Sequence, residues 1–207
     1  MPTRRLVVLA VAGALPLLAA LAALFVLRDS GASTSDYRGS RPPEGYIAPT
    51  FRLRSYTGRD VRMDELRDKT VVLTFLDAQC QESCPVIAAA AARARARLDP
   101  EDRARVALIA ITTDPAEDTP AVVRSFLRRY RAEGALDYLV GPELELRRVW
   151  RDYGVLPSES SGSDDLHSAP VRIYAPGGEW VSTLSAAVEL TPRNLAHDIE
   201  VAIAKSS

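Results

Sequence analysis

The stretch TVVLTFLDAQCQESCP, from Thr70 to Pro85, decides the fold class. Its first half, ending at Leu76, is a β-rich apolar run of the kind that parallel sheets bury on both faces. Its second half ends in a proline, which the first turn of a helix tolerates because no N–H is needed there. The stretch therefore predicts a central strand, then a short loop with Cys80 and Cys84, then a helix.

Strand and helix signals continue on both sides of this stretch. Residues 51–56 and 60–63 alternate apolar and polar side chains around a turn, which predicts a β-hairpin near the start of the domain. Further on we predict helices at 85–98, 119–132 and 142–153, strands at 105–111 and 136–140, a hairpin of 171–174 with 180–184, and a last helix after Thr191. This order predicts a thioredoxin-like α/β sandwich with a central mixed sheet, although other α/β folds share it.

Composition excludes one large class of partners. The 207 residues include 26 Lys and Arg scattered among 27 Asp and Glu, which gives a net charge of −1. Proteins that bind nucleic acid usually concentrate positive charge on one surface. We therefore expect one folded domain and no nucleic-acid partner.

The N-terminus has the pattern of a membrane anchor. Arg4 and Arg5 precede an uncharged run at residues 6–27, which is long enough to cross a hydrocarbon core of ~30 Å. A cleaved signal peptide is the alternative, but its apolar region is usually only about 7–15 residues long. The positive-inside rule puts the two arginines in the cytoplasm. We expect a cytoplasmic N-terminus at 1–5, a retained transmembrane helix at 6–27, a flexible linker at 28–45, and an extracytoplasmic thioredoxin-like domain at 46–207 of a single-pass cell-membrane protein.

Cys80 and Cys84 are the two cysteines of the chain and three residues separate them. At a strand-to-helix junction, the positive end of the helix dipole favours the thiolate form. Two thiolates on one helical turn can bind a single soft metal ion or exchange with a disulfide. A structural disulfide is the other interpretation, but such a small loop would constrain the unfolded chain little.

The chain also has two histidines, which are candidates for a third metal ligand. His167 lies in a polar loop directly before a predicted core strand, whereas His197 lies inside the last predicted helix. Sulfur donors together with an imidazole suit copper better than they suit hard cations. His167 is the better candidate, although a loop histidine without a role is the commoner case when it is considered alone. His197 fits an exposed helix residue.

Three motifs together resemble the Sco/SenC family. They are the C-x-x-x-C-P motif of residues 80–85, the segment ITTDPAEDTP of residues 111–120, and His167-Ser168 ahead of VRIYAPGG at 171–178. Family members are similar in having one membrane anchor, a thioredoxin-like domain, the cysteine motif and a downstream His-Ser or His-Thr pair. The resemblance covers nearly the whole chain from Tyr46.

The resemblance implies a copper ion bound by Cys80, Cys84 and His167. It also implies a role in assembling the binuclear copper centre of a respiratory cytochrome oxidase. The partner would then be the copper-bearing subunit of the oxidase, or another copper or thiol protein.

The sequence departs from the family pattern beside these ligands. Gln81 and Glu82 replace the usual Pro and Asp between the cysteines, and Leu166 replaces the usual Asp before the histidine. Groups that support metal ligands are worth about 10–100-fold in affinity, so the strength of copper binding stays open. Pro170 stands about where thioredoxins have a cis proline opposite the active cysteines, and an ordinary trans bond is the alternative.

Two functions fit these residues. The first is a copper metallochaperone, which holds one copper ion and passes it to an oxidase subunit. The second is a membrane-anchored thiol–disulfide oxidoreductase, in which Cys80 attacks a partner disulfide and Cys84 resolves the mixed disulfide. Both functions can coexist, because reduction of the acceptor's cysteines can precede copper delivery. A peroxidase is disfavoured, since the surroundings of Cys80 lack the Thr and Arg neighbours that such enzymes generally have.

Overall fold

A mixed β-sheet forms the centre of the protein. The structure is a computed structural model and describes residues 36–155 and 170–205. In this part of the chain one seven-stranded sheet has the order β2-β1-β5-β4-β3-β6-β7. The three central strands are parallel to one another, and the outer strands pair antiparallel. The strands are β1 (Arg52–Ser55), β2 (Asp60–Arg62), β3 (Thr70–Leu76), β4 (Val106–Thr112), β5 (Asp137–Val140), β6 (Val171–Tyr174) and β7 (Trp180–Leu184).

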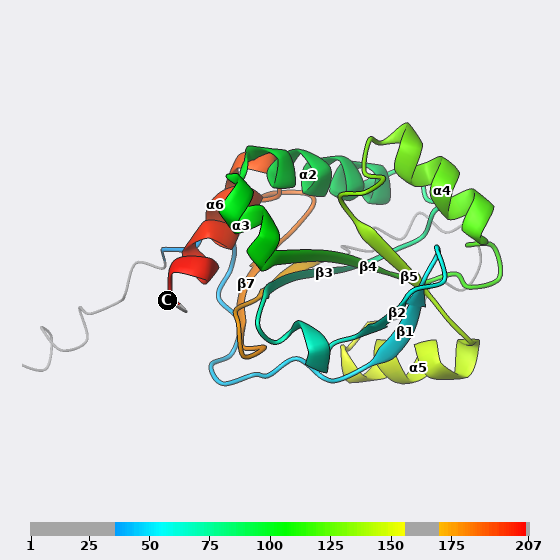
Figure 1. Cartoon of the computed structure of the whole chain (residues 1–207), viewed down its shortest axis with the longest axis horizontal. Coiled ribbons are helices and arrows are strands. Elements are labelled where there is room, and N and C mark those ends of the chain that lie inside the picture. Colours follow the sequence, from blue (N-terminus) through cyan, green and yellow to red (C-terminus); the bar gives the residue numbers. More distant parts are fainter. Residues whose placement is uncertain (1–35, 156–169, 206–207) are drawn as a thin grey trace, which may run out of the picture. The chain divides into compact units, whose positions relative to one another are not determined.

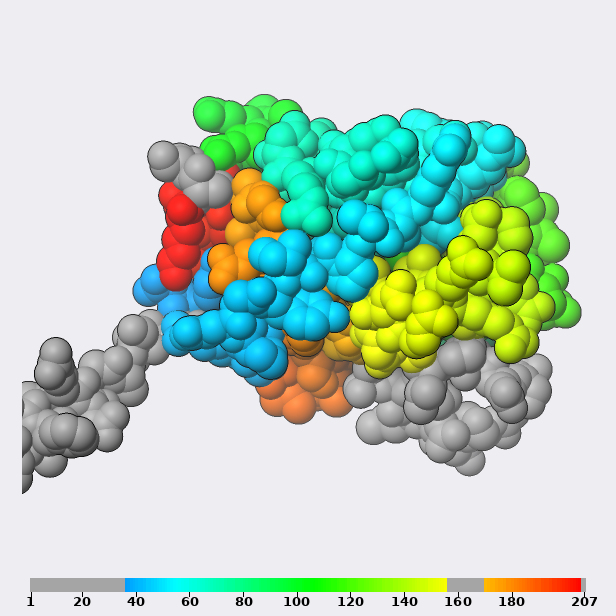
Figure 2. All heavy atoms as spheres, turned by 90° about the horizontal axis from the view of Figure 1, so that it is seen from below, coloured from blue at the N-terminus to red at the C-terminus, as the bar shows by residue number. Residues whose placement is uncertain are grey.

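Helices cover both faces of this sheet. The helices are η1 (Asp64–Leu66), α2 (Ser83–Arg97), α3 (Pro100–Arg105), α4 (Pro120–Arg129), α5 (Glu143–Asp152) and α6 (Pro192–Ala204). α2, α4 and α6 lie over one face, whereas α5 lies over the other (Figure 1). Figure 2 shows the second face, where the chain before β3 (blue to cyan) and α5 (yellow) cover the sheet. The sheet is therefore sandwiched between two apolar layers.

β3 owes its central place to its apolar residues. All seven of its residues are buried. Val72 and Leu76 pack with the helices of the first face, and Leu73 packs with the α5 layer, because successive strand residues point to opposite faces. A run of apolar residues without alternation fits this double burial. The predicted thioredoxin-like sandwich with a mixed central sheet and an N-terminal hairpin agrees with this architecture.

α2 follows the cysteine loop and packs along α6. Its buried face includes Cys84, Ile87, Ala88 and Ala91, which recur at helical spacing. The alanine side chains are small, so α6 can lie close to α2. The first turn of α2 is thereby fixed against the core at the place where the cysteines lie.

One helix was not predicted from the sequence. The helix predicted at 85–98 stops before Asp99 and Pro100, and these two residues begin α3. The Asp99 side chain accepts a hydrogen bond from Asp102 N, and Pro100 occupies the first turn. Both residues favour a helix start as much as a helix end, so their presence does not distinguish the two.

The chain joins the folded domain earlier than predicted. Residues from Asp36 to Ser207 form one compact unit, although residues 36–45 were expected to belong to a flexible linker. The amides of Arg38 and Gly39 donate hydrogen bonds to the buried carboxylate of Asp198, at 2.6 and 3.0 Å. Ser40 forms a bridge with Thr183 of β7. This attached segment therefore extends the sheet edge at β7.

The predicted membrane anchor lies outside the described residues. Within residues 36–155 and 170–205, none of the helices has the length and apolar character needed to cross a bilayer. The transmembrane helix at 6–27 and the cytoplasmic N-terminus at 1–5 stay predictions.

Candidate metal centre

The cysteine loop turns tightly between β3 and α2. Gln79 N donates to Asp77 Oδ1 at 2.6 Å, and Cys80 N donates to Asp77 O at 3.2 Å. The side chain and the carbonyl of Asp77 thus close the turn before α2 begins at Ser83. Asp77 therefore orders the backbone that leads to Cys80.

Cys80 and Cys84 are brought together as two free thiols of different exposure. Cys84 lies in the first turn of α2 and is 6% exposed, packed in the apolar cluster of that face. Cys80 is half-buried at the edge of the same cluster. The pair thus presents one accessible sulfur and one protected sulfur at the same place.

The two thiols differ strongly in acidity. The hydrogen bond from Cys84 lowers the pKa of Cys80 to about 5, and backbone N–H groups of Cys84 and Glu82 add to this effect against the opposing effect of burial. The pKa of Cys84 is raised well above its ordinary value, first by this hydrogen bond and then by burial. At neutral pH Cys80 is therefore a thiolate that accepts a hydrogen bond from a neutral Cys84.

This pair can bind a soft metal ion but does not complete its coordination. Thiolates are ligands for copper(I) and zinc rather than for hard cations. Among the residues that the structure describes, no group of three or more His, Cys, Asp and Glu side chains is arranged to hold a metal ion. His167 and Ala169 lie in the segment 156–169, outside the described residues. Ligation by His167 and the conformation of the bond before Pro170 stay predictions.

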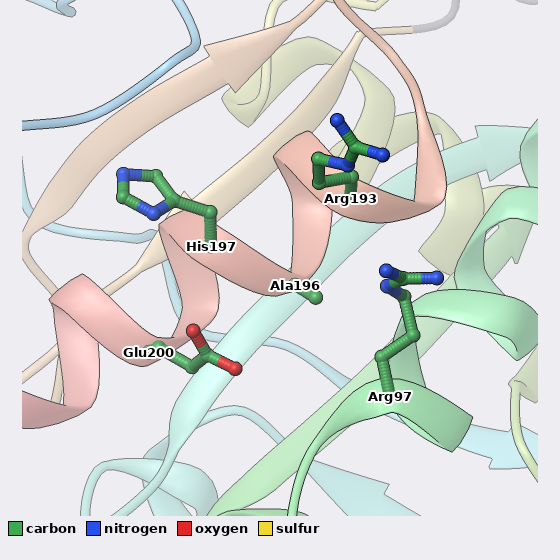
Figure 3. Close-up of a pocket in the computed structure, with 5 residues that line it drawn as sticks. All are labelled: Arg97, Arg193, Ala196, His197 and Glu200. Atoms are coloured by element: carbon green, nitrogen blue, oxygen red, sulfur yellow. The ribbon is translucent and has the colours of Figure 1, made fainter.

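His197 lies on α6, near the end of α2 that is far from the cysteines. It lines a hollow of about 490 Å³ together with Arg97 at the end of α2 and with Arg193, Ala196 and Glu200 of α6 (Figure 3). Its Nε2 lies 2.8 Å from the carbonyl oxygen of Asp36. Arg97 follows Cys84 by thirteen residues on one helix, which corresponds to roughly 20 Å. His197 therefore holds the attached N-terminal segment and stands apart from the thiol pair.

A buried carboxyl group beneath the cysteine loop was given no role from the sequence. Asp118 is 3% exposed, and its Oδ1 accepts a hydrogen bond from Ala78 N at 3.0 Å. Its Oδ2 accepts hydrogen bonds from Thr112 Oγ1 and Tyr138 Oη, both at 2.6 Å. Burial raises its pKa to about 6. In the sequence, the segment 111–120 was the available signal for this carboxyl group. The spacing of its acidic residues does not show that Asp118 is the buried one.

Comparison with known proteins connects the chain with one family. The profile described as SCO1/SenC matches residues 40–204. A protein of Stutzerimonas stutzeri whose name describes it as copper-binding is 27% identical over 152 residues, which cover 72% of this chain and 74% of that protein. Protein SCO2, mitochondrial, of Saccharomyces cerevisiae is 25% identical over 140 residues, which cover 65% of this chain and 46% of that protein.

Solved structures with the same fold include Sco proteins. Apo Sco1 of Thermus thermophilus matches with a TM-score of 0.67 and 23% identity, over 83% of this chain and 100% of the other. Copper-bound ScoI of Bradyrhizobium japonicum matches with a TM-score of 0.62 and 25% identity, over 76% of this chain and 100% of the other. The thioredoxin-like fold of this chain is therefore the fold of these Sco structures.

Proposed function

The chain belongs to the SCO1/SenC family, and from this membership we propose that it is a copper metallochaperone that assists assembly of the binuclear copper centre of a respiratory cytochrome oxidase. The observation that carries the proposal is the pair of free thiols, with Cys80 half-buried in the loop before α2 and Cys84 buried in the first turn of α2. Copper is the cargo, and its acceptor is the copper-bearing subunit of the oxidase or another copper or thiol protein.

We assign three ligands, which are Cys80, Cys84 and His167. Both sulfur atoms bind copper as thiolates, so loading displaces the proton that Cys84 holds. Support for the histidine comes from the sheet register. Leu73 of β3 pairs with Arg172 of β6 in antiparallel orientation, so β6 starts beside the end of β3 that leads to the cysteine loop. Three residues of chain from Pro170 to His167 can span up to about 10 Å, and on this basis we assign the imidazole to the thiol pair.

The proposal includes a location outside the cytoplasm. The apolar run at residues 6–27 serves as a transmembrane helix, and the two arginines before it stay on the cytoplasmic side. The folded domain then lies on the extracytoplasmic side of the membrane.

A second function uses the same pair as a thiol–disulfide oxidoreductase. The difference in exposure favours it, because the half-buried thiolate of Cys80 is the accessible nucleophile and the buried Cys84 is the resolving thiol. In this reaction the Cys80 sulfur bonds to one sulfur of a partner disulfide and the other sulfur leaves as a thiolate. Cys84 then forms the Cys80–Cys84 disulfide and releases the reduced partner.

Copper titration of the reduced full-length chain tests the first function. We expect one copper(I) ion per chain, measured against a competing chelator under anaerobic conditions. His167→Ala, Cys80→Ser and Cys84→Ser each lose more affinity than the about 10–100-fold that loss of a supporting partner costs. His197→Ala is the matched control and binds copper as the unaltered chain does. Equal affinity in the His167 and His197 variants would reject the ligand assignment, and weak binding in every variant would leave the oxidoreductase as the function.

A further inference from the structure

Asp118 connects the cysteine loop with the three parallel strands β3, β4 and β5. Tyr138 of β5 is fully buried, and its hydroxyl lies 2.6 Å from Asp118 Oδ2 and 2.8 Å from Leu76 O at the end of β3. Thr112 at the end of β4 is also fully buried and donates to the same carboxyl oxygen. Because Ala78 N donates to the other oxygen, a single carboxyl group connects all these elements.

The segment that carries Asp118 is itself held firmly. Asp118 N donates to Asp114 O at 3.0 Å, and Asp114 N donates to Thr112 Oγ1 at 3.0 Å. Thr119, the next residue, caps α4 through a hydrogen bond from Val122 N. The carboxyl group is thus fixed between β4 and α4 without any contribution from the cysteine loop. The loop is positioned by Asp118 rather than the reverse.

The contact with Ala78 acts close to the thiols. Ala78 lies inside the turn that runs from Asp77 to Cys80 and is closed by the hydrogen bond from Cys80 N to Asp77 O. A hydrogen bond to a carboxylate is stronger than one between neutral groups. Losing it leaves the Ala78 amide without this acceptor and frees the turn to move. The place of the Cys80 sulfur relative to Cys84 then changes.

We propose that Asp118 is a positioning residue for the thiol pair, which holds through Ala78 N the loop that places Cys80 beside Cys84. The inference rests on the proposed function only in treating the two cysteines as the functional pair. It applies equally to copper binding and to disulfide exchange. A residue that merely stabilised the fold would leave the chemistry of the folded thiol pair unchanged.

The redox equilibrium of the full-length chain with glutathione provides the test. One glutathione disulfide oxidises the two thiols, which yields the Cys80–Cys84 disulfide and two reduced glutathione molecules. Because Asp118 holds the reduced arrangement, Asp118→Ala is expected to shift this equilibrium at least about tenfold toward the protein disulfide, which corresponds to about 30 mV. Asp118→Asn keeps an oxygen that can accept from Ala78 N, so it is expected to stay within about threefold of the unaltered chain. Asp118→Asn therefore distinguishes the effect of the hydrogen bond from Ala78 N from the effect of the negative charge of Asp118.

Two further variants keep the test decisive. Leu146 is fully buried in the α5 layer, so Leu146→Ala destabilises the fold from the opposite face and is expected to leave the equilibrium unchanged. If Asp118→Ala does not fold, Asp118→Leu fills the cavity while still lacking an acceptor and is expected to show the same shift. An unshifted equilibrium in a folded Asp118 variant without an acceptor, or an equal shift in Leu146→Ala, would overturn the proposal. Because this readout needs no copper, it is independent of whether the chain binds copper.

Discussion

Cys80 is half-buried in the loop before α2 and Cys84 is buried in the first turn of α2, and hydrogen bonding from Cys84 lowers the pKa of the more exposed cysteine. The two groups share one proton between sulfur atoms of unequal burial. The buried Cys84 keeps that proton because a second negative charge beside Cys80 would lie in apolar surroundings. The short segment from Cys80 to Cys84 therefore contains a reactive thiolate and a protected thiol.

The first prediction concerns alkylation of the reduced protein. The pKa of Cys80 is lowered to about 5, so its thiolate form dominates at pH 7 and its reaction rate falls about tenfold per pH unit below that pKa. We expect iodoacetamide to modify Cys80 alone in the folded protein, as measured by mass spectrometry of peptides. In urea both cysteines are expected to react with the pH dependence of an ordinary thiol, with a pKa near about 8.5. Rapid modification of Cys84 in the folded state would contradict the assignment.

The second prediction concerns Asp118 and the pH dependence of stability. Burial raises its pKa to about 6 in the folded protein, whereas an unfolded Asp has a pKa of about 3.9. The folded state binds the Asp118 proton more tightly than the unfolded state does. The stabilising contribution of the protonated carboxyl is therefore fully present below pH 4 and is lost as the pH rises through 6. Relative to Asp118→Asn, the unaltered chain is expected to lose up to about 3 kcal/mol of unfolding free energy between pH 4 and pH 7.

Urea unfolding of both proteins at each pH measures this difference. Cys80 titrates in both proteins, so its contribution largely cancels in the comparison. A difference that stays constant with pH would show that the pKa of Asp118 is not raised.

The sheet could be predicted from the sequence because its signals are local. β3 is a continuous apolar run, and α4 begins at a Thr-Pro pair whose Thr119 side chain accepts from Val122 N as expected for a cap. α3 was missed because its capping pair, Asp99 and Pro100, is equally typical of a helix end. The attachment of residues 36–45 was missed because it depends on Asp198, which lies far away in the sequence.

The candidate site could be predicted in part for the same physical reason. The spacing of Cys80 and Cys84 at a strand-to-helix junction predicted that they lie close together. The prediction that both share one helical turn was wrong, because α2 begins at Ser83 and Cys80 lies in the loop before it. The contact between Ala78 and Asp118 joins residues forty positions apart, and sequence periodicity does not report such a contact. His167 has no spacing signal relative to the cysteines and lies outside the described residues.

The third prediction concerns the segment that joins the domain at its N-terminal side. A Cβ atom on Gly39 would lie 2.3 Å from Ser182 Oγ and 2.5 Å from Thr183 O. Gly39→Ala is therefore expected to cost about 1–3 kcal/mol of unfolding free energy, as overpacking does in a core. Ser40→Ala is the control, because Ser40 is exposed and such changes usually stay within about 0.5 kcal/mol. Urea unfolding monitored by tryptophan fluorescence measures both, and equal stability of the two variants would mean that the segment is not attached in solution.

The fourth prediction concerns the protons that copper releases. At pH 8, Cys80 is already a thiolate, whereas Cys84 has to lose its proton when copper binds. Calorimetry in buffers of different ionisation enthalpy is therefore expected to show release of about one proton per copper(I) ion at this pH. Near pH 5.5 a second proton is expected, because an imidazole with the ordinary pKa of about 6.5 has to be deprotonated to bind.

One variant distinguishes the sources of these protons. His167→Ala is expected to remove the additional proton at pH 5.5 while leaving the release at pH 8 unchanged. The release that His167→Ala keeps at pH 8 then comes from Cys84, because Cys80 is already a thiolate at this pH. Release of two protons by the unaltered chain at pH 8 would instead show that both cysteines are neutral thiols, and the hydrogen bond between them would then not lower the pKa of Cys80.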